Sequence, residues 1–281
     1  MWGKRLFSSF LLWGTLLLIL FVPDSTGPWS CLMICFFALP TVWEIGRISS
    51  QRKAVMPVLM VGSVLLIVGT YAVLKDGQNP DLAHWIEKAS ALFVLIGSAV
   101  VIMCRGELSG GLEDLGVTML AFLLGAWTVN HLNLLNFFFS GGPLGRQVIL
   151  WIIIVTKFMD AGAFAVGSLI GRHKIVPRIS PKKTWEGTIG GVVASTLTGA
   201  LMYLAFRPSM QGAGIGWGHV LAVAPVLGMV GFWGDLAGSL VKRSAGVKDS
   251  GQIFPGIGGM LDLMDSLLFT LPLSYLLLKL L

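Results

Sequence analysis

The stretch "IFPGIGGMLDLMDSLLF", residues 253–269, places two carboxylates at the head of an apolar run that continues almost to the end of the chain. Asp262 and Asp265 are three residues apart, so they share one face if the stretch is helical. Acidic side chains inside a membrane helix are costly and indicate a functional site by default. The rest of the sequence has to explain what these acids do.

The composition is that of a membrane protein. The chain has 281 residues, of which 55% are hydrophobic and 12% are charged, whereas a soluble domain has about 25% charged residues. The mean hydropathy is +0.81. We therefore predict an all-α, polytopic integral membrane protein.

A membrane helix needs about 20 mainly apolar residues. The sequence offers about nine such segments, roughly 7–23, 29–46, 54–74, 89–104, 115–134, 147–170, 187–206, 217–241 and 260–280. With the N-terminus in the cytosol and the C-terminus outside, most of the 20 Lys and Arg residues fall on the cytosolic side, as the positive-inside rule requires. We expect residues 1–140 to anchor and pack, and residues 141–281 to form a catalytic region that faces the cytosol.

The first polar segment is "TKFMDAGAFAVGSLIGRHKIVPRISPKKTWEGTIGG", residues 156–191. Its glycines at 167 and 171, and at 187 and 191, have the spacing that lets membrane helices approach closely. Between them lies a basic loop, in which Ser180 and Pro181 could open a helical turn that points backbone N–H groups at an anion. The alternative is an ordinary positive-inside loop.

The second polar segment is "GDLAGSLVKRSAGVKDSG", residues 234–251. Asp235, Ser239 and Lys242 are spaced i, i+4 and i+7, which places them on one helix face. For Asp235 the alternative role is an ion pair between packed helices. For Asp262 and Asp265 the alternative is a position in headgroup water.

Acids and bases thus meet on one side of the membrane. Neighbouring carboxylates repel each other unless a cation lies between them, and Mg²⁺ binds one or two carboxylates together with substrate phosphates. The four histidines, His84, His131, His173 and His219, are scattered and form no zinc motif. The residues therefore indicate a metal-assisted phosphoryl or nucleotidyl transferase.

Residues 239–266 resemble the signature of the phosphatidate cytidylyltransferases, also called CDP-diacylglycerol synthases. That signature runs Ser-x-x-Lys-Arg, four residues, Lys-Asp, then Pro-Gly-His-Gly-Gly, then Asp-Arg-x-Asp. The basic segment described above is similar to the family's upstream block. The matching positions are Ser239, Lys242, Arg243, Lys248, Asp249, Pro255, Gly256, Gly258, Gly259, Asp262 and Asp265.

The resemblance implies that CTP and phosphatidate give CDP-diacylglycerol and pyrophosphate, with the lipid phosphate attacking the α-phosphorus of CTP. It implies that Asp235, Asp262 and Asp265 bind Mg²⁺ and leave room for a second cation. Together with Lys183, these three acids are the expected catalytic residues. The expected substrate-binding residues are Asp160, Arg172, Lys174, Ser180, Lys182, Lys183, Thr184, Glu186, Ser239, Lys242, Arg243, Lys248 and Asp249.

Two positions depart from the signature. Ile257 stands where the family has His and cannot donate a hydrogen bond, and Leu263 stands where it has Arg and cannot neutralise phosphate. His173 or Arg172 could compensate. The alternatives to a cytidylyltransferase are a CTP-dependent lipid kinase of the polyprenol type, a catalytically weakened paralogue and a transporter-like protein.

The expected location is the bacterial inner membrane, with the site facing the cytosol. The expected partners are CTP, phosphatidate and membrane lipids, with no nucleic acid, and the glycine faces are compatible with a homodimer.

Overall fold

The computed structural model describes residues 27–48, 54–77, 80–105, 109–139, 143–212, 214–254 and 258–280. Within these ranges the secondary structure is helical, with two isolated β-bridges and no strand. The predicted all-α fold is therefore confirmed for the described part of the chain.

Seven helical segments are long and apolar enough to cross a membrane, which makes the chain an integral membrane protein. They correspond to the second through eighth predicted spans, and the first prediction, 7–23, falls outside the described residues. The segments are α2 (Pro28–Arg47), α3 (Met56–Lys75), α4 (Pro80–Cys104), the continuous run of α5 (Gly111–Ala121), η1 (Phe122–Trp127) and α6 (Thr128–Phe138), then α7 (Pro143–Ile170), α8 (Trp185–Ala205) and α10 (Trp217–Ser244).

The predicted last span is divided. α11 (Met260–Met264) is followed by a turn at Asp265 and Ser266, and then by α12 (Leu267–Leu280), an apolar helix of 14 residues. The backbone N–H of Ser266 donates to Oδ1 of Asp265 (2.8 Å). This side chain bond competes with a continuous helix, which explains the break.

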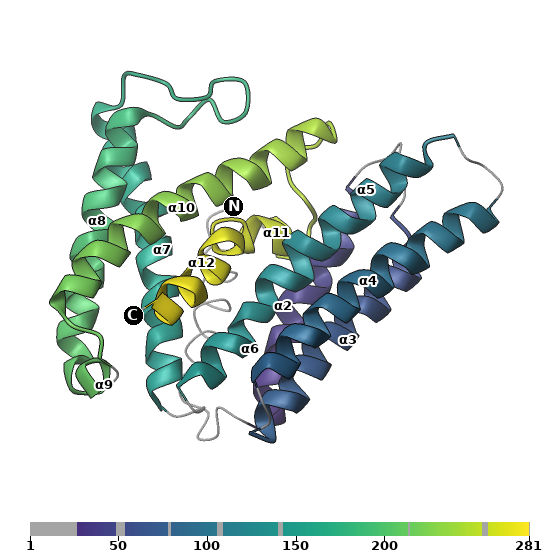
Figure 1. Cartoon of the computed structure of the whole chain (residues 1–281). Coiled ribbons are helices and arrows are strands. Elements are labelled where there is room, and N and C mark those ends of the chain that lie inside the picture. The colour runs from purple at the N-terminus through teal and green to yellow at the C-terminus, as the bar shows by residue number, and fades with distance from the viewer. Residues whose placement is uncertain are drawn as a thin grey trace. The chain divides into compact units, whose positions relative to one another are not determined.

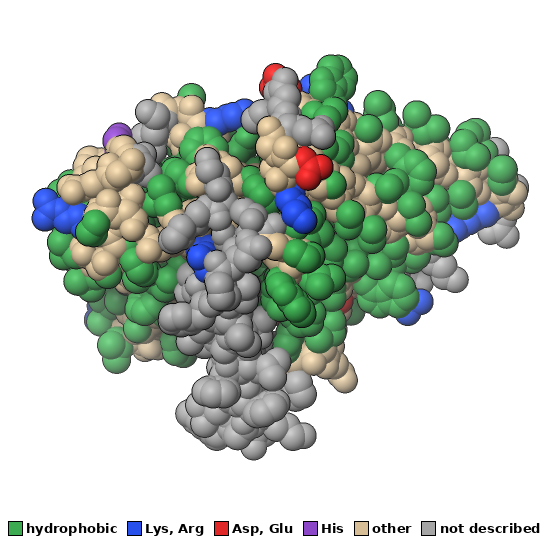
Figure 2. All heavy atoms as spheres, turned by 90° about the horizontal axis from the view of Figure 1, so that it is seen from below, with side chains coloured by type: hydrophobic (Ala, Val, Ile, Leu, Met, Phe, Trp, Pro, Cys, Tyr) green, Lys and Arg blue, Asp and Glu red, His purple; other side chains and the backbone are tan. Residues whose placement is uncertain are grey.

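The surface is largely apolar. Figure 2 shows hydrophobic side chains over much of one face, with few charged ones among them. Large apolar side chains point outward on several helices, including Leu65 on α3, Ile96 on α4 and Leu201 on α8, which are 50%, 59% and 66% exposed. Such exposure is expected for helices whose solvent is lipid.

The chain folds into two compact units, which are discontinuous in sequence. The first holds residues 1–137 and 244–264, and the second holds residues 138–243 and 265–281. The first therefore contains α2 to α6 and α11, and the second contains α7, α8, α9 (Arg207–Gly212), α10 and α12 (Figure 1).

In the first unit, α2 packs against α3, η1 and α11. η1 is a short π-helix, a widened turn that interrupts the α-helical ladder. Its Gly125 lies against the backbone of Val42 on α2, where an added Cβ would come within 3.0 Å of the Val42 Cα. A side chain at this position would force the two helices apart.

In the second unit, α7 and α8 pack closely through the predicted glycines. A Cβ on Gly187 would lie 2.7 Å from the carbonyl oxygen of Ala163, and one on Gly191 would lie 2.6 Å from that of Met159. The two backbones therefore touch where the glycines lie. The prediction of close helix approach at 187 and 191 is confirmed.

Candidate active site

The basic loop between α7 and α8, residues 171–184, has a defined structure. Lys174 and Thr184 form an antiparallel bridge, and the N–H of Trp185 donates to the carbonyl of His173 (3.0 Å). Ile175, Val176 and Ile179 pack against a buried cluster of Met159, Phe232 and Leu236 from α7 and α10. The apolar side chains thus anchor the loop, and the basic ones alternate with them.

The prediction that Ser180 is an N-cap and Pro181 the first helical residue is wrong. The N–H of Lys183 donates to the carbonyl of Ser180 (3.3 Å), which closes a single turn, and α8 begins only at Trp185. Pro181 fixes the backbone for such a turn. The N-cap is Thr184, whose hydroxyl accepts from the N–H of Gly187 (3.2 Å).

Lys183 points inward from this loop to α10. Its ammonium lies 2.6 Å from Oδ2 of Asp235, donates to the carbonyl of Phe232 (3.2 Å) and sits 4.1 Å from the centre of the Phe232 ring. Its side chain is 15% exposed and that of Asp235 is 28% exposed. The remaining basic side chains of the loop, Arg172, Lys174, Arg178 and Lys182, are exposed.

One face of α10 carries the second polar segment. Asp235, Ser239 and Lys242 follow one another at one and two helical turns, as the spacing predicted. Gly234 and Gly238 lie beside them, and an added Cβ would come within 2.7 Å of the Asp265 carbonyl oxygen or 2.8 Å of the Asp265 Cβ. Because these glycines have no side chain, Asp265 can approach the face of α10 that carries Asp235.

Asp265 is buried next to Asp235. The two carboxyl groups lie within hydrogen-bonding distance of each other, and Lys242 Nζ lies 3.8 Å from Asp265 Oδ2. Lys242 is itself buried, with 7% of its surface exposed. Two neighbouring carboxylates are tolerated because Lys183 and Lys242 balance their charge.

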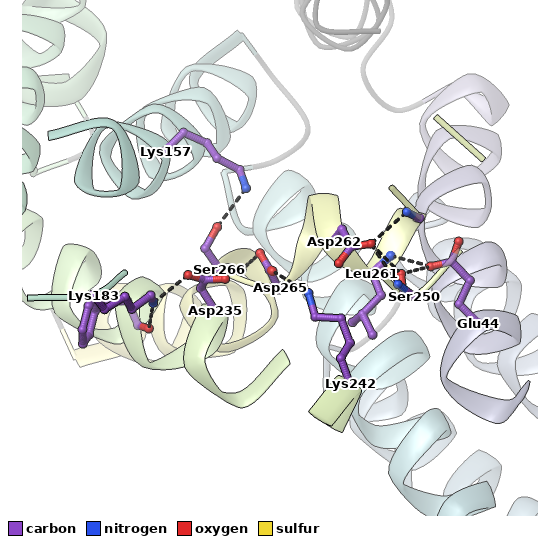
Figure 3. A network of polar contacts seen from close by, with 12 residues as sticks. Glu44, Lys157, Lys183, Asp235, Lys242, Ser250, Leu261, Asp262, Asp265 and Ser266 are labelled. Atoms are coloured by element: carbon purple, nitrogen blue, oxygen red, sulfur yellow. Dashed lines mark hydrogen bonds and ion pairs between the residues drawn. The ribbon is translucent and has the colours of Figure 1, made fainter. Parts of the chain in front are cut away.

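Asp160 on α7 is the third acid of this group, and it is linked to the group through Ser266 in the turn after α11. Lys157 Nζ on α7 donates to Oγ of Ser266 (2.8 Å), and the Asp160 carboxylate accepts a hydrogen bond from the Ser266 hydroxyl. Among the described residues of the second unit, three acids and three lysines therefore meet around Asp265 and Ser266. Figure 3 shows the three lysines with Asp235, Asp265 and Ser266. Such an arrangement can exchange carboxylate partners for the phosphates of a bound substrate.

The sequence of the chain also matches a known protein family. A sequence model described as the cytidylyltransferase family matches residues 3–281. The chain belongs to the cytidylyltransferase family.

Relatives within this family carry a more specific name. A protein of Staphylococcus saprophyticus named phosphatidate cytidylyltransferase is 32% identical over 251 residues, which covers 79% of this chain and 93% of the relative. One of Brucella suis with the same name is 31% identical over 238 residues, covering 85% of this chain and 80% of the relative. The similarity thus extends through both units.

The acids near Asp235 suit a cation that also binds phosphate. Within the described ranges, no group of three or more His, Cys, Asp and Glu side chains could hold a metal ion. Asp235 and Asp265 offer a pair of adjacent carboxylates, and Mg²⁺ characteristically uses one or two carboxylates with water and substrate oxygens for the rest. The number and type of these ligands are therefore compatible with Mg²⁺.

Asp262 has different surroundings, in the first unit. Its Oδ2 accepts hydrogen bonds from the N–H of Ser250 (3.0 Å) and of Gly259 (2.9 Å), and lies 3.1 Å from the Ser250 hydroxyl. The carboxylate thereby fixes the turn that precedes α11. Its role as a metal ligand stays a prediction.

Glu44 on α2 was missed by the sequence analysis. It is 5% exposed and lies next to Ser250 and the start of α11 (Figure 3). An acid inside the apolar segment 29–46 was an available signal, because such acids are rare in membrane helices. Nothing in the local sequence indicates its partners, which lie more than 200 residues away.

The other predicted substrate contacts stay predictions. Glu186 accepts from the N–H groups of Arg172 (3.1 Å) and His173, and lies 2.6 Å from Nδ1 of His173, so it holds the loop at the start of α8. Arg243, Lys248 and Asp249 are exposed.

Of the two positions that depart from the signature, only Leu263 lies within the described residues. Ile257 falls outside the described residues. Leu263, which replaces the family's Arg, is buried in α11 with 7% of its surface exposed.

Proposed function

We propose that this protein is a phosphatidate cytidylyltransferase, which transfers the cytidylyl group of CTP to phosphatidate and releases pyrophosphate. Membership of the cytidylyltransferase family and the shared name of its relatives support the reaction. The observation that carries the proposal is the group of lysines and aspartates around Asp265, because the lysines can bind phosphate oxygens and the aspartates can hold a cation that binds them too.

The reaction needs no nucleophile from the protein. A phosphate oxygen of the lipid is already anionic, and it attacks the α-phosphorus of CTP while the bond to pyrophosphate breaks. The protein has to bring two anionic substrates together and stabilise the charge that develops on the leaving group.

The lysines are suited to that task. Lys183 and Lys242 pair with Asp235 and Asp265 in the structure, and phosphate oxygens can replace those partners when substrate binds. Lys183 would hold a phosphate of CTP and Lys242 the departing pyrophosphate or the lipid phosphate. Asp160 and Ser239 would complete the polar surface around them.

Mg²⁺ would be held by Asp235 and Asp265, with CTP supplying further oxygens. When bound, it would neutralise the phosphates and favour departure of pyrophosphate. Asp160 would then order Ser266 and Lys157, as its hydrogen bond to Ser266 already indicates.

A lipid substrate also fits the outer face of α7. Phe164 and Leu169 are 74% and 83% exposed, and the basic loop begins directly after this helix. Acyl chains could lie against the apolar side chains while the phosphate meets Arg172 or Lys174. The positive-inside rule supports a site that faces the cytosol, and the bacterial relatives support the inner membrane.

The test is product analysis on purified protein with CTP, phosphatidate and Mg²⁺, with and without a chelator. We expect equal amounts of pyrophosphate and CDP-diacylglycerol, and loss of both with the chelator. Release of CDP with a phosphorylated lipid would identify a kinase instead. Absence of any product with every divalent metal would overturn the proposal.

Asp235→Asn tests the assigned acid. We expect turnover to fall by about a hundredfold or more, because Asn cannot balance Lys183 or hold a cation. Asp76→Asn is the control, since Asp76 is an exposed acid just after α3. A similar melting temperature for both variants would show that the protein remains folded, and near-normal turnover of Asp235→Asn would contradict the assignment.

A further inference from the structure

Glu44 is a buried acid that makes no bond to a cationic side chain in any contact the structure shows, yet it is satisfied by three donors. Its Oε1 accepts from the N–H of Met260 (2.8 Å), and its Oε2 accepts from the N–H of Leu261 (2.9 Å) and the hydroxyl of Ser250 (2.7 Å). A carboxylate so deeply buried is expensive unless each oxygen is hydrogen-bonded. These bonds are therefore what keeps an acid at this position of α2.

Ser250 connects Glu44 to Asp262. Its hydroxyl lies 2.7 Å from Glu44 Oε2 and 3.1 Å from Asp262 Oδ2, while its N–H donates to the same Asp262 oxygen (3.0 Å). One hydroxyl proton serves one acceptor at a time, and the shorter distance favours Glu44. Figure 3 shows Glu44, Ser250 and Asp262 forming one chain of contacts.

The surrounding backbone is shaped to fit the Glu44 carboxylate. A Cβ at Gly251 would lie 2.6 Å from Glu44 Oε1, and one at Gly259 would collide with both carboxylate oxygens. Gly258 has a φ of +129°, a conformation that favours glycine. The turn thus surrounds the Glu44 carboxylate, and Asp262 follows it along the chain.

We propose that Glu44 is a positioning residue, which fixes the turn at Ser250 and the start of α11 and so sets the direction of the Asp262 side chain. The proposal rests on the proposed function and on the expectation, drawn from the sequence, that Asp262 takes part in cytidylyl transfer. Glu44 does not itself touch substrate. It holds the backbone that Asp262 also binds, through Ser250 on one side and the Met260 and Leu261 amides on the other.

A carboxylate is required here because all three neighbours donate. A glutamine at this position would present an NH₂ group to at least one of these donors, so one hydrogen bond would be replaced by a repulsion. Glu44→Gln keeps the size of the side chain and removes the acceptor. It is therefore a sharper test than truncation.

Thr41→Val is the matched control. Thr41 lies one turn earlier on α2, is fully buried, and its hydroxyl donates to the carbonyl of Phe37 (2.7 Å) within the same helix. Its replacement changes a buried polar group of α2 and leaves the turn at Ser250 alone. Any general weakening of α2 would affect both variants.

The experiment measures steady-state kinetics and backbone hydrogen exchange on the same full-length proteins. For Glu44→Gln we expect kcat to fall by about 10- to 100-fold, as for partners that orient a reacting group. The KM for CTP should change less than about threefold, since the lysines that bind phosphate are untouched. Exchange should accelerate at residues 250 and 259–261 and stay unchanged along the rest of α2. Thr41→Val should match the wild type in kcat and in exchange at these residues.

Three results would overturn the proposal. One is a kcat of Glu44→Gln close to the wild type. Another is a reduced kcat with unchanged exchange at 250 and 259–261. The third is faster exchange throughout the first unit, which would assign Glu44 to general stability.

Ser250→Ala provides the second variant if Glu44→Gln fails to fold. Ala cannot donate to Glu44 Oε2 but leaves the Met260 and Leu261 bonds in place. In that case a kcat of Ser250→Ala close to the wild type would contradict the proposal. Where Glu44→Gln does fold, the double variant with Ser250→Ala should be less than additive in kcat, because both changes act through one turn. Full additivity would contradict the proposal.

The hydrogen-exchange measurement distinguishes failure of the proposed function from failure of the positioning role of Glu44. If the wild type made no CDP-diacylglycerol, the proposed function would fail, and faster exchange in Glu44→Gln would still assign Glu44 to this turn. If the wild type were active and exchange did not respond, the positioning role alone would fail.

Discussion

Lys182 and Lys183 are neighbours of the same chemistry with different surroundings. Lys182 is exposed, whereas Lys183 lies against Asp235 and the ring of Phe232. The family resemblance assigned both to substrate binding and only Lys183 to catalysis as well, without a physical reason for the difference. The structure distinguishes them, since the loop packing around Ile175 and Ile179 turns Lys183 inward.

This difference predicts separate kinetic effects. Lys183→Met should lower kcat by about a hundredfold, because a cation buried beside the reacting phosphates is lost. Lys182→Met should mainly raise the KM for CTP, by a few-fold, because an exposed lysine attracts substrate through solvent. Measuring kcat and KM for the pair tests this assignment. Equal losses in kcat would mean that the inward direction of Lys183 has no role in turnover.

At the same scale, sequence reasoning found the acids of α10 and of the turn after α11, but it did not find Glu44. Asp235, Ser239 and Lys242 are detectable because a helical repeat links them within a few residues. The partners of Glu44 are backbone amides and a serine far along the chain. Such contacts leave no local pattern, so they become visible only in three dimensions.

Among the elements, the contact of α7 with α8 depends on glycines that leave no room for a side chain. Apolar length and small-residue spacing were sufficient to predict these helices and the glycines that join them. The same signals did not predict the start of α8, because the sequence analysis placed the N-cap at Ser180, whereas the structure has it at Thr184. Loop packing and the Glu186 bonds decide between them.

Gly191→Ala tests this contact. The added Cβ would lie 2.6 Å from both the carbonyl oxygen and the sulfur of Met159. We expect the free energy of unfolding to fall by about 1–3 kcal/mol, as is usual for overpacking. Thermal or denaturant unfolding in detergent measures the change.

The control is Gly116→Ala on α5, where an added Cβ meets nothing within 4 Å. Alanine favours helix over glycine by about 1 kcal/mol, so this variant should be as stable as the wild type or slightly more so. If both substitutions had the same effect, backbone propensity rather than the α7–α8 contact would explain the first.

For the whole molecule, apolar runs predicted a multi-spanning protein because hydropathy alone fixes which segments can lie in lipid. They could not predict that residues 244–264 join the first unit. Hydropathy is a local property, whereas this arrangement depends on long-range contacts. The predicted roles of residues 1–140 and 141–281, and the orientation in the membrane, stay predictions.

Orientation can be tested with single cysteines in a variant whose three native cysteines are replaced by serine. Arg178→Cys in the loop before α8 should react with an impermeant thiol reagent only from the cytosolic side. Asp76→Cys after α3 should react only from the opposite side. Three candidate spans, an odd number, lie between the two positions in the described part of the chain. The opposite pattern would contradict the predicted orientation.

The return of residues 244–264 to the first unit has a consequence for the order of folding. Glu44 and Met260 are 216 residues apart, so helix α2 enters the membrane long before its carboxylate can meet the amides that satisfy it. Throughout synthesis of the second unit, this side chain lacks the hydrogen-bond donors that surround it in the folded protein, so it needs water or other polar partners. The first unit is therefore synthesised first but can be completed only after residues 244–264 have been made, which requires closing a long loop.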